Sequence, residues 1–209
     1  MNYYTDIVTQ KSWEELKRLR KITDFILIGG WAVYLYTKTL KSKDIDIIVD
    51  FDKLPILGKH YIFGKNDRLK KYEARKEEVQ IDIYLPHYSQ IGIPVEILIK
   101  QTKNLEGFTV VDSDYLLTLK IYTLLQRGRT PKGRKDFVDI IALINARVFE
   151  WEKLKTIFKT YALQKALDNF FEFLNEYYEV PELNLNNHQF AKLKKEFKVR
   201  KLQIKEFHS

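Results

Sequence analysis

The chain has 209 residues, of which 45% are apolar and 31% are charged. This length suits one large domain or two small ones, and the apolar content is sufficient for a buried core. The net charge of +8 favours a polyanionic partner, with phosphate groups as the first candidates. The absence of cysteine excludes disulfides, thiolate zinc sites and thiol catalysis. No signal-peptide pattern or membrane-spanning apolar run is present, so we expect a cytoplasmic protein with no membrane partner.

The first half of the chain mixes helical and strand patterns. Apolar residues at helical spacing predict an opening helix over 13–22. A wholly apolar run over 25–28, closed by Gly29 and Gly30, predicts a buried strand that enters a tight turn. A second helix is expected to start at this glycine pair and to run through Trp31 to about Tyr36. Further strands are expected over 43–50, 79–85 and 95–99, with a looser one between 70 and 74.

The second half of the chain follows helical periodicity. Amphipathic or apolar patterns predict helices over 114–126, 136–146, 151–161 and 163–178. The tail over 188–209 has seven basic and two acidic residues, and its pattern suits a helix or a strand equally. We therefore expect an α/β (α+β) fold, with a mixed central sheet flanked by helices over residues 1–110 and an all-helical region with a basic tail over 111–209.

Three aspartates carry the chemistry that the sequence suggests. Asp44 and Asp46 lie two apart on a predicted strand, so their carboxylates leave the same face with Cβ atoms roughly 6 to 7 Å apart. Carboxylates drawn to about 4 Å repel by roughly 4 kcal/mol at an effective dielectric near 20, so they need a cation. Hard oxygen ligands select Mg²⁺ or Mn²⁺. Asp82, flanked by isoleucines in another predicted strand, joins them if the strands are neighbours; alternatively, the acids merely face water.

The Gly29–Gly30 pair is a second candidate feature, between the predicted strand over 25–28 and the following helix. Residues without a Cβ let backbone amides and the helix N-terminus approach a phosphate. Such pairs are also ordinary turn residues. The combination of strand, glycine pair, helix and three strand-borne acids favours the phosphate-binding interpretation.

The succession of Gly29–Gly30, Asp44-Ile45-Asp46 and Asp82 resembles the DNA polymerase beta-like nucleotidyltransferase superfamily, and within it the minimal nucleotidyltransferases and AbiEii-type toxins. The resemblance implies that the glycine turn holds the triphosphate of an incoming nucleotide. It further implies that Asp44 and Asp46 bind two metal ions, Mg²⁺ or Mn²⁺, and that Asp82 completes the metal site. Ser42 matches a small hydroxyl commonly found there, whereas Leu40 stands where an arginine is often found.

The helical half adds to the resemblance. Lys120 lies in line with an apolar stripe, so it needs a buried partner or extends its amine to solvent. AbiEii-like proteins have a lysine in a similar helix, followed by a motif that residues 134–140 match. On this basis Lys120 steadies the triphosphate, and Lys43, Lys135 and Asp136 are placed at the nucleotide site. Asp136 and Asp139 either orient these cations or are simply acids favoured near a helix N-terminus.

The resemblance implies an enzyme that moves a nucleoside monophosphate from a nucleoside triphosphate to a hydroxyl acceptor. Five cations in the segment 127–135 form either a solvated loop or a phosphate contact, and they favour a tRNA or other RNA end as acceptor. A protein hydroxyl, a small molecule such as an aminoglycoside, and a catalytically silent nucleotide- or RNA-binding module are the alternatives. A toxin of this type would have a cognate antitoxin as partner.

Overall fold

The computed structural model describes the backbone of residues 6–205 and the side chains of residues 6–199. Within this part of the chain, seven strands form one mixed sheet in the order β3-β4-β5-β2-β1-β7-β6. β1 pairs in parallel with β7, and β2 with β5, while the other neighbours are antiparallel. The strands are β1 (Ile26–Ile28), β2 (Ile45–Ile48), β3 (Ile62–Asn66), β4 (Lys71–Lys76), β5 (Val79–Tyr84), β6 (Thr102–Leu105) and β7 (Phe108–Val111).

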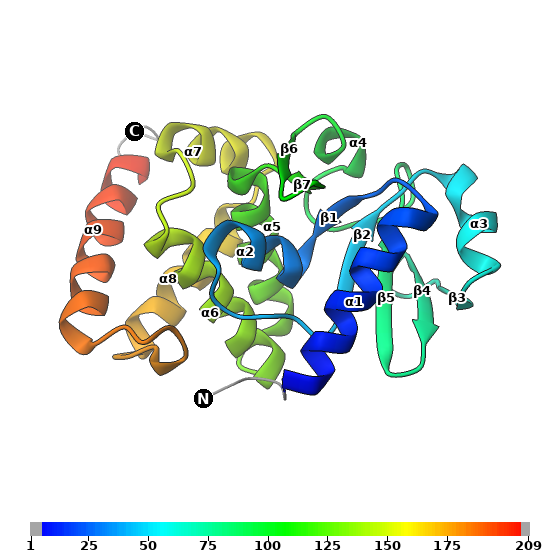
Figure 1. Ribbon diagram of the computed structural model, residues 1–209. Helices are drawn as coiled ribbons and strands as arrows, with labels where there is room; N and C mark the ends of the chain where they lie inside the picture. The colour runs from blue at the N-terminus through cyan, green and yellow to red at the C-terminus, as the bar shows by residue number, and fades with distance from the viewer. Residues whose placement is uncertain (1–5, 206–209) are drawn as a thin grey trace.

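Helices cover the sheet and form the second half of the molecule. Figure 1 shows α1 lying across the sheet and α5 to α9 gathered to one side of it. Short 3-10 turns lie at Phe51–Lys53 and Pro181–Leu183. The helices are α1 (Asp6–Ile22), α2 (Gly29–Thr37), α3 (Leu54–Gly58), α4 (Val95–Leu98), α5 (Ser113–Arg127), α6 (Pro131–Asn145), α7 (Trp151–Thr160), α8 (Gln164–Glu176) and α9 (Asn187–Lys205).

The connection from β1 to α2 is immediate. Leu27 and Ile28 are buried, and Ile28 is still extended when it caps the helix. Gly29 follows with φ of +68°, in the left-handed region that only glycine adopts without a steric penalty. The chain can therefore turn from a buried strand into a helix within a single residue.

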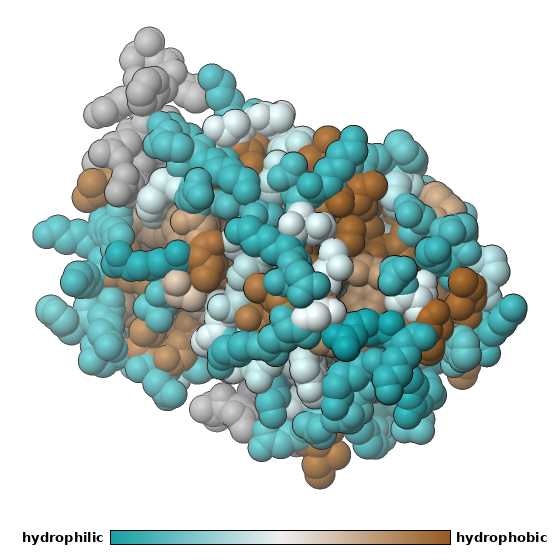
Figure 2. Space-filling model, turned by 45° about the horizontal axis from the view of Figure 1, so that its top comes forward, coloured by the Kyte–Doolittle hydropathy of each residue, from teal (hydrophilic) through white to brown (hydrophobic). Residues whose placement is uncertain are grey.

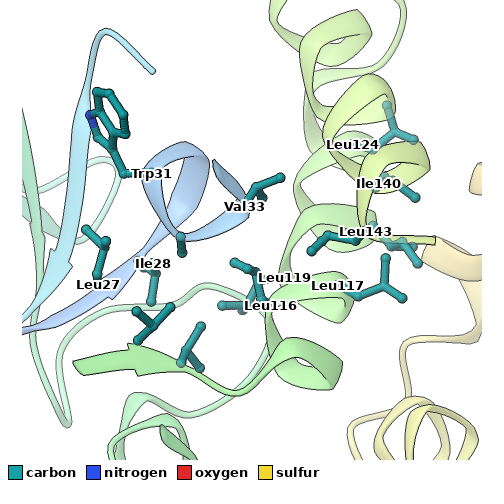
Figure 3. Close-up of a cluster of buried hydrophobic side chains, with 14 of the residues drawn as sticks. Leu27, Ile28, Trp31, Val33, Leu116, Leu117, Leu119, Leu124, Ile140 and Leu143 are labelled. Carbon is teal, nitrogen blue, oxygen red and sulfur yellow. The ribbon is translucent and has the colours of Figure 1, made fainter. Parts of the chain in front are cut away.

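The core joins the sheet to the helical half through α5. Figure 3 shows Leu116 and Leu119 on the side of α5 that faces α2 and the sheet, whereas Leu117 and Leu143 lie between α5 and α6. All four side chains are buried, and each contributes about 1.5–3 kcal/mol by leaving water. This apolar contact on two faces fixes α5 and α6 against the sheet, and with them the polar side chains on the same helices.

The predicted fold class is confirmed: the sheet is mixed, helices flank it, and a helical region follows. The strand predicted over 95–99 is wrong, because this segment forms α4. Pro94, with φ of −55°, precedes the helix, and a short apolar run does not distinguish a strand from a helix. The sequence patterns do not predict β3, β6 or β7. β3 and β6 are edge strands with polar side chains, and β7 has only four residues.

The basic tail forms α9 rather than a strand as far as Lys205, and residues 206–209 lie outside the described part of the chain. Phe190, Leu193 and Phe197 are buried along one face of this helix, at spacings of three and four residues. The domain boundary predicted at residue 110 falls where β7 gives way to α5, and the division into two domains stays a prediction. Among the described residues, no helix is long and apolar enough to cross a membrane.

Candidate active site

A cleft of about 540 Å³ lies where the sheet meets α5 and α6. The acid cluster, defined as Asp44, Asp46 and Asp82, lines it from the sheet, and lysines line it from the helices. Arg68 and Leu69, from the turn between β3 and β4, also contribute to the lining. Figure 2 shows one face of the molecule, on which hydrophilic residues predominate and apolar residues form several smaller groups. A polar cleft of this size suits a charged ligand.

The strand register brings the acids together. Asp46 on β2 is the direct partner of Asp82 on the parallel strand β5, and Asp44 lies just before β2. The expectation that the two strands are neighbours is therefore confirmed. Strands that run side by side place partner residues about 4.8 Å apart along the sheet, so the two carboxylates are forced into proximity.

Burial and mutual repulsion act on the acid cluster. Burial, and after it the neighbouring charge of Asp82, raises the pKa of Asp46 to about 6, although Lys120 opposes the shift. Burial also raises the pKa of Asp44, with Lys43 opposing the shift. Both changes disfavour the ionised forms, so these acids occupy a position where additional positive charge would be stabilising.

The glycine turn packs directly against these groups. A Cβ at Gly29 would lie 2.0 Å from Asp46 Oδ2, which leaves no room for any side chain at this position. A Cβ at Gly30 would lie 2.6 Å from Ser42 Oγ and 3.1 Å from Lys135 Nζ. The turn is thus enclosed by an acid on one side and by a hydroxyl and an ammonium group on the other.

The ion-pair cluster, defined as Lys120, Lys135, Asp136 and Asp139, lies on α5 and α6. Lys120 Nζ is 3.0 Å from Asp136 Oδ1 and 2.7 Å from Asp139 Oδ2, and Lys135 Nζ is 3.1 Å from the same Asp139 oxygen. Burial alone would lower the pKa of Lys120, but Asp139 and Asp136 outweigh it and raise the pKa. Both helix acids therefore orient cations, and Lys120 stays charged.

Arg127 extends the ion-pair cluster by donating to Asp136 Oδ2 at 2.8 Å. The other cations of the basic segment are mostly engaged as well: Arg129 pairs with Glu176 and Arg134 with Glu182. Within residues 6–199, Lys132 makes no ion pair, and it lines the cleft. The arginines of this segment consequently link helices through ion pairs. Lys132 is the cation of the segment that is best placed to bind a ligand.

Asp82 has partners of its own. Lys71 Nζ on β4 is 2.5 Å from Asp82 Oδ2, and Gln80 Nε2 donates to Asp82 Oδ1 at 2.8 Å. Among the described side chains, no three acids or histidines come close enough together to form a ready-made metal site. Asp44 and Asp46 nevertheless fit a divalent cation, because they offer hard oxygen ligands whose charge is incompletely compensated. Mg²⁺ commonly uses one or two carboxylates together with substrate phosphates.

The residues predicted from the sequence gather at this one place. Gly29 contacts Asp46, and the remaining nine line the cleft, namely Gly30, Ser42, Lys43, Asp44, Asp46, Asp82, Lys120, Lys135 and Asp136. Sequence reasoning missed Lys71, Gln80 and Arg68. Lys71 stands in a stretch with charges at most positions, so neither its burial nor its partner could be recognised without the strand pairing.

Comparison with known proteins supports the fold. No protein-family model matches the chain, and no curated protein matches it in sequence. A crystal structure from H. pylori, whose own assignment as a nucleotidyltransferase is provisional, matches with a TM-score of 0.53 and 16% identity, over 96% of this chain and 99% of that one. The chain has the nucleotidyltransferase fold. At this identity the match shows the fold alone, so the AbiEii-like subtype predicted from the resemblance stays a prediction.

Two further structures match at a lower TM-score of 0.49. One is JHP933 from Helicobacter pylori, with 16% identity over 94% of both chains. The other is the antibiotic-resistance factor ANT(2'')-Ia, with 12% identity over 77% of this chain and 90% of that one. The assignment of the nucleotidyltransferase fold rests on the first structure, and the chemistry must be argued from the cleft itself.

Proposed function

We propose that the protein is a Mg²⁺-dependent nucleotidyltransferase that moves a nucleoside monophosphate from a nucleoside triphosphate to a hydroxyl acceptor. One observation carries the proposal: a single cleft is lined by the acid cluster, by the glycine turn at Gly30 and by part of the ion-pair cluster, although these come from segments far apart in the sequence. The lining residues of the ion-pair cluster are Lys120, Lys135 and Asp136. Acids suited to a cation and ammonium groups suited to phosphates are the two requirements of a metal-bound triphosphate.

The triphosphate would bind beside the glycine turn. Lys120 and Lys135 present charged ammonium groups there, and Asp136 and Asp139 hold them in place. Gly30 lets a phosphate approach the backbone at the start of α2, where amide groups point outward. These contacts would fix the α-phosphorus in the cleft and neutralise the charge that develops on the leaving phosphates.

Asp44 and Asp46 would hold the divalent cation between the acid cluster and the triphosphate. When bound, Mg²⁺ neutralises phosphate charge and lowers the pKa of a coordinated hydroxyl. The acceptor oxygen attacks the α-phosphorus in line with the bond to the bridging oxygen, that bond breaks, and pyrophosphate leaves. The hydroxyl proton is released in the same step, and the carboxylates of the acid cluster are the bases that line the cleft.

We favour an RNA end, such as that of a tRNA, as the acceptor. Arg68 and Lys132 line the cleft from opposite elements, the β3–β4 turn and α6, and so place positive charge on both sides of its opening. An acceptor with a phosphate backbone would use both cations. The overall charge of +8 supports the same choice. We also propose a role as a toxin with an antitoxin partner, and only the sequence resemblance supports this part of the proposal.

The test is transfer of label from each α-³²P-labelled nucleoside triphosphate with Mg²⁺, offering tRNA, the protein itself and an aminoglycoside as separate acceptors. We expect labelled tRNA with the unaltered protein and at least 1,000-fold less with Asp46→Asn or Asp44→Asn, a loss of about 4 kcal/mol in transition-state stabilisation. Asp50→Asn, which changes an exposed acid just beyond β2, is the matched control and should leave transfer intact.

Equal labelling by Asp46→Asn and the unaltered protein would refute the assignment of the acid cluster. Label in the protein or in the aminoglycoside, with none in tRNA, would retain nucleotidyl transfer but change the acceptor. Tight RNA binding that is indifferent to Mg²⁺, without transfer to any acceptor, would identify a silent binding module instead.

A further inference from the structure

Lys71 is a buried cation that the proposed reaction does not use. Its side chain is only 8% exposed, although it begins β4, which is next to β5 in the sheet. Its ammonium group lies 2.5 Å from Asp82 Oδ2 and 3.1 Å from Glu73 Oε1. A lysine in such a position is stable only with acids beside it, so Lys71 and Asp82 depend on each other.

The sheet fixes the surroundings of this pair. Glu73 is the register partner of Asp82, and it also accepts a hydrogen bond of 2.8 Å from Asn66 Nδ2 on β3. Gln80, two residues before Asp82 on the same face of β5, bonds the second carboxylate oxygen. Each oxygen of Asp82 therefore already has a donor, Lys71 on β4 or Gln80 on β5, and β3 supports the group through the bond from Asn66 to Glu73.

Asp46 differs from its register partner. Within the described residues its side chain forms no hydrogen bond or ion pair. It lies against the glycine turn and the other two acids, and Lys120 and Arg127 act on it only through their charge. The acid cluster thus divides into Asp82, which has a cation supplied by the protein, and Asp44 and Asp46, whose charge remains to be balanced. A divalent cation has most to gain beside the second group.

We propose that Lys71 is a permanent counter-ion of Asp82 and keeps this carboxylate from binding a metal ion. The nucleotide-free cleft then binds one divalent cation, at Asp44 and Asp46, instead of two. The inference rests on the proposed function, because it assumes that these acids hold a metal ion. In this arrangement Lys71 is a positioning residue. It fixes the charge and orientation of Asp82 through the contacts above, and it replaces the second ion that the sequence resemblance implies.

The experiment counts bound Mn²⁺ in the nucleotide-free protein, by isothermal titration calorimetry and by the electron paramagnetic resonance signal of free Mn²⁺. We expect one Mn²⁺ per chain for the unaltered protein and for Asp82→Asn. Lys71→Met, which keeps the aliphatic stem and removes the charge, should bind two. The double variant Lys71→Met/Asp82→Asn should return to one, because the second ion needs the freed carboxylate.

Arg75→Met is the matched control, since Arg75 lies on the same face of β4, is exposed and carries the same charge, but does not contact Asp82. It should bind one Mn²⁺. Circular dichroism establishes whether Lys71→Met is folded; if it is not, Lys71→Gln, which keeps a hydrogen-bond donor, replaces it with the same expectation.

Two Mn²⁺ in the unaltered protein, with one lost in Asp82→Asn, would overturn the inference, because Asp82 would then be a metal ligand already. A folded Lys71 variant that still binds one Mn²⁺ would overturn it too, as would the absence of binding in every variant. Nucleotide transfer is measured separately and can succeed in each of these cases, so failure of the inference is distinguishable from failure of the proposed function.

Discussion

The ion-pair cluster and the acid cluster balance their charges in opposite ways. In the ion-pair cluster, buried cations and acids alternate within hydrogen-bond distance, and the pKa of Lys120 rises while that of Asp139 falls. In the acid cluster like charges are neighbours, and the pKa values of Asp44 and Asp46 rise. The charges of the ion-pair cluster are paired within the protein, whereas the charge of the acid cluster is fully balanced only when a cation binds. The ion-pair cluster therefore contributes to stability before any ligand binds, whereas the acid cluster gains most from a bound cation.

Lys120→Met tests the ion-pair cluster and should have the largest effect. It leaves Asp136 and Asp139 buried beside a missing charge, so we expect a loss of about 3–5 kcal/mol in the free energy of unfolding. Urea titration followed by circular dichroism measures it. Lys11→Met, which breaks an exposed pair with Glu78, is the control and should leave the unfolding midpoint nearly unchanged. Equal midpoints for both variants would show that the buried ion pairs of Lys120 contribute no more to stability than the exposed pair of Lys11 with Glu78.

In the acid cluster, unlike the ion-pair cluster, the presence of charge should lower the free energy of unfolding. Since burial raises the pKa of Asp46 to about 6, well above its ordinary value, the unfolded chain releases this proton at a lower pH than the folded protein does. The contribution of Asp46 to the free energy of unfolding of metal-free protein should therefore fall by on the order of 3 kcal/mol as pH rises from about 4 to 6.

Asp46→Asn should remove this part of the pH dependence, which urea titrations in the presence of a chelator can measure. Saturating Mg²⁺ should reduce it in the unaltered protein, because a bound cation favours the ionised form. Asp50→Asn is again the control. If Asp46→Asn and the unaltered protein follow parallel curves, the carboxylate is not under electrostatic strain.

Gly29→Ala should disturb the contact between the turn and the acid cluster. An alanine at φ of +68° costs about 1–2 kcal/mol, and its Cβ would displace the Asp46 carboxylate. We expect a modest loss of stability together with a disproportionate loss of Mn²⁺ affinity. Gly64→Ala, where a Cβ would meet nothing within 4 Å, is the control for stability and for metal binding. Unchanged Mn²⁺ affinity in folded Gly29→Ala would contradict the packing argument.

The cations at the cleft opening should have the smallest effects. Lys132→Ala and Arg68→Ala should each lower kcat/KM for tRNA roughly fivefold, about 1 kcal/mol, and reduce its dependence on salt. Lys59→Ala, an exposed lysine outside the cleft, is the comparison. An equal decrease for all three variants would indicate a general charge effect instead of a local contact.

Local patterns were sufficient for much of the cleft. The continuous apolar run before Gly29–Gly30 is typical of a buried strand. The alternation around Asp46 and Asp82 is a period-two signal, which a strand produces because it places alternate side chains on opposite faces. The helical repeat likewise located α5, with Lys120 on it. Val95–Leu98 shows the limit of this reasoning, because a short and mainly apolar segment after a proline satisfies a strand and a helix equally.

The sequence by itself determined which chemical groups this protein can use: three acids, a glycine pair and a set of lysines in segments of recognisable type. Only the tertiary structure decided how those charges are paired. Lys71 reaches Asp82 because β4 lies beside β5, and Lys120 reaches Asp136 because α5 packs on α6. Such pairings depend on contacts between segments distant in sequence, and electrostatic energy depends on distance in space, which no local pattern encodes.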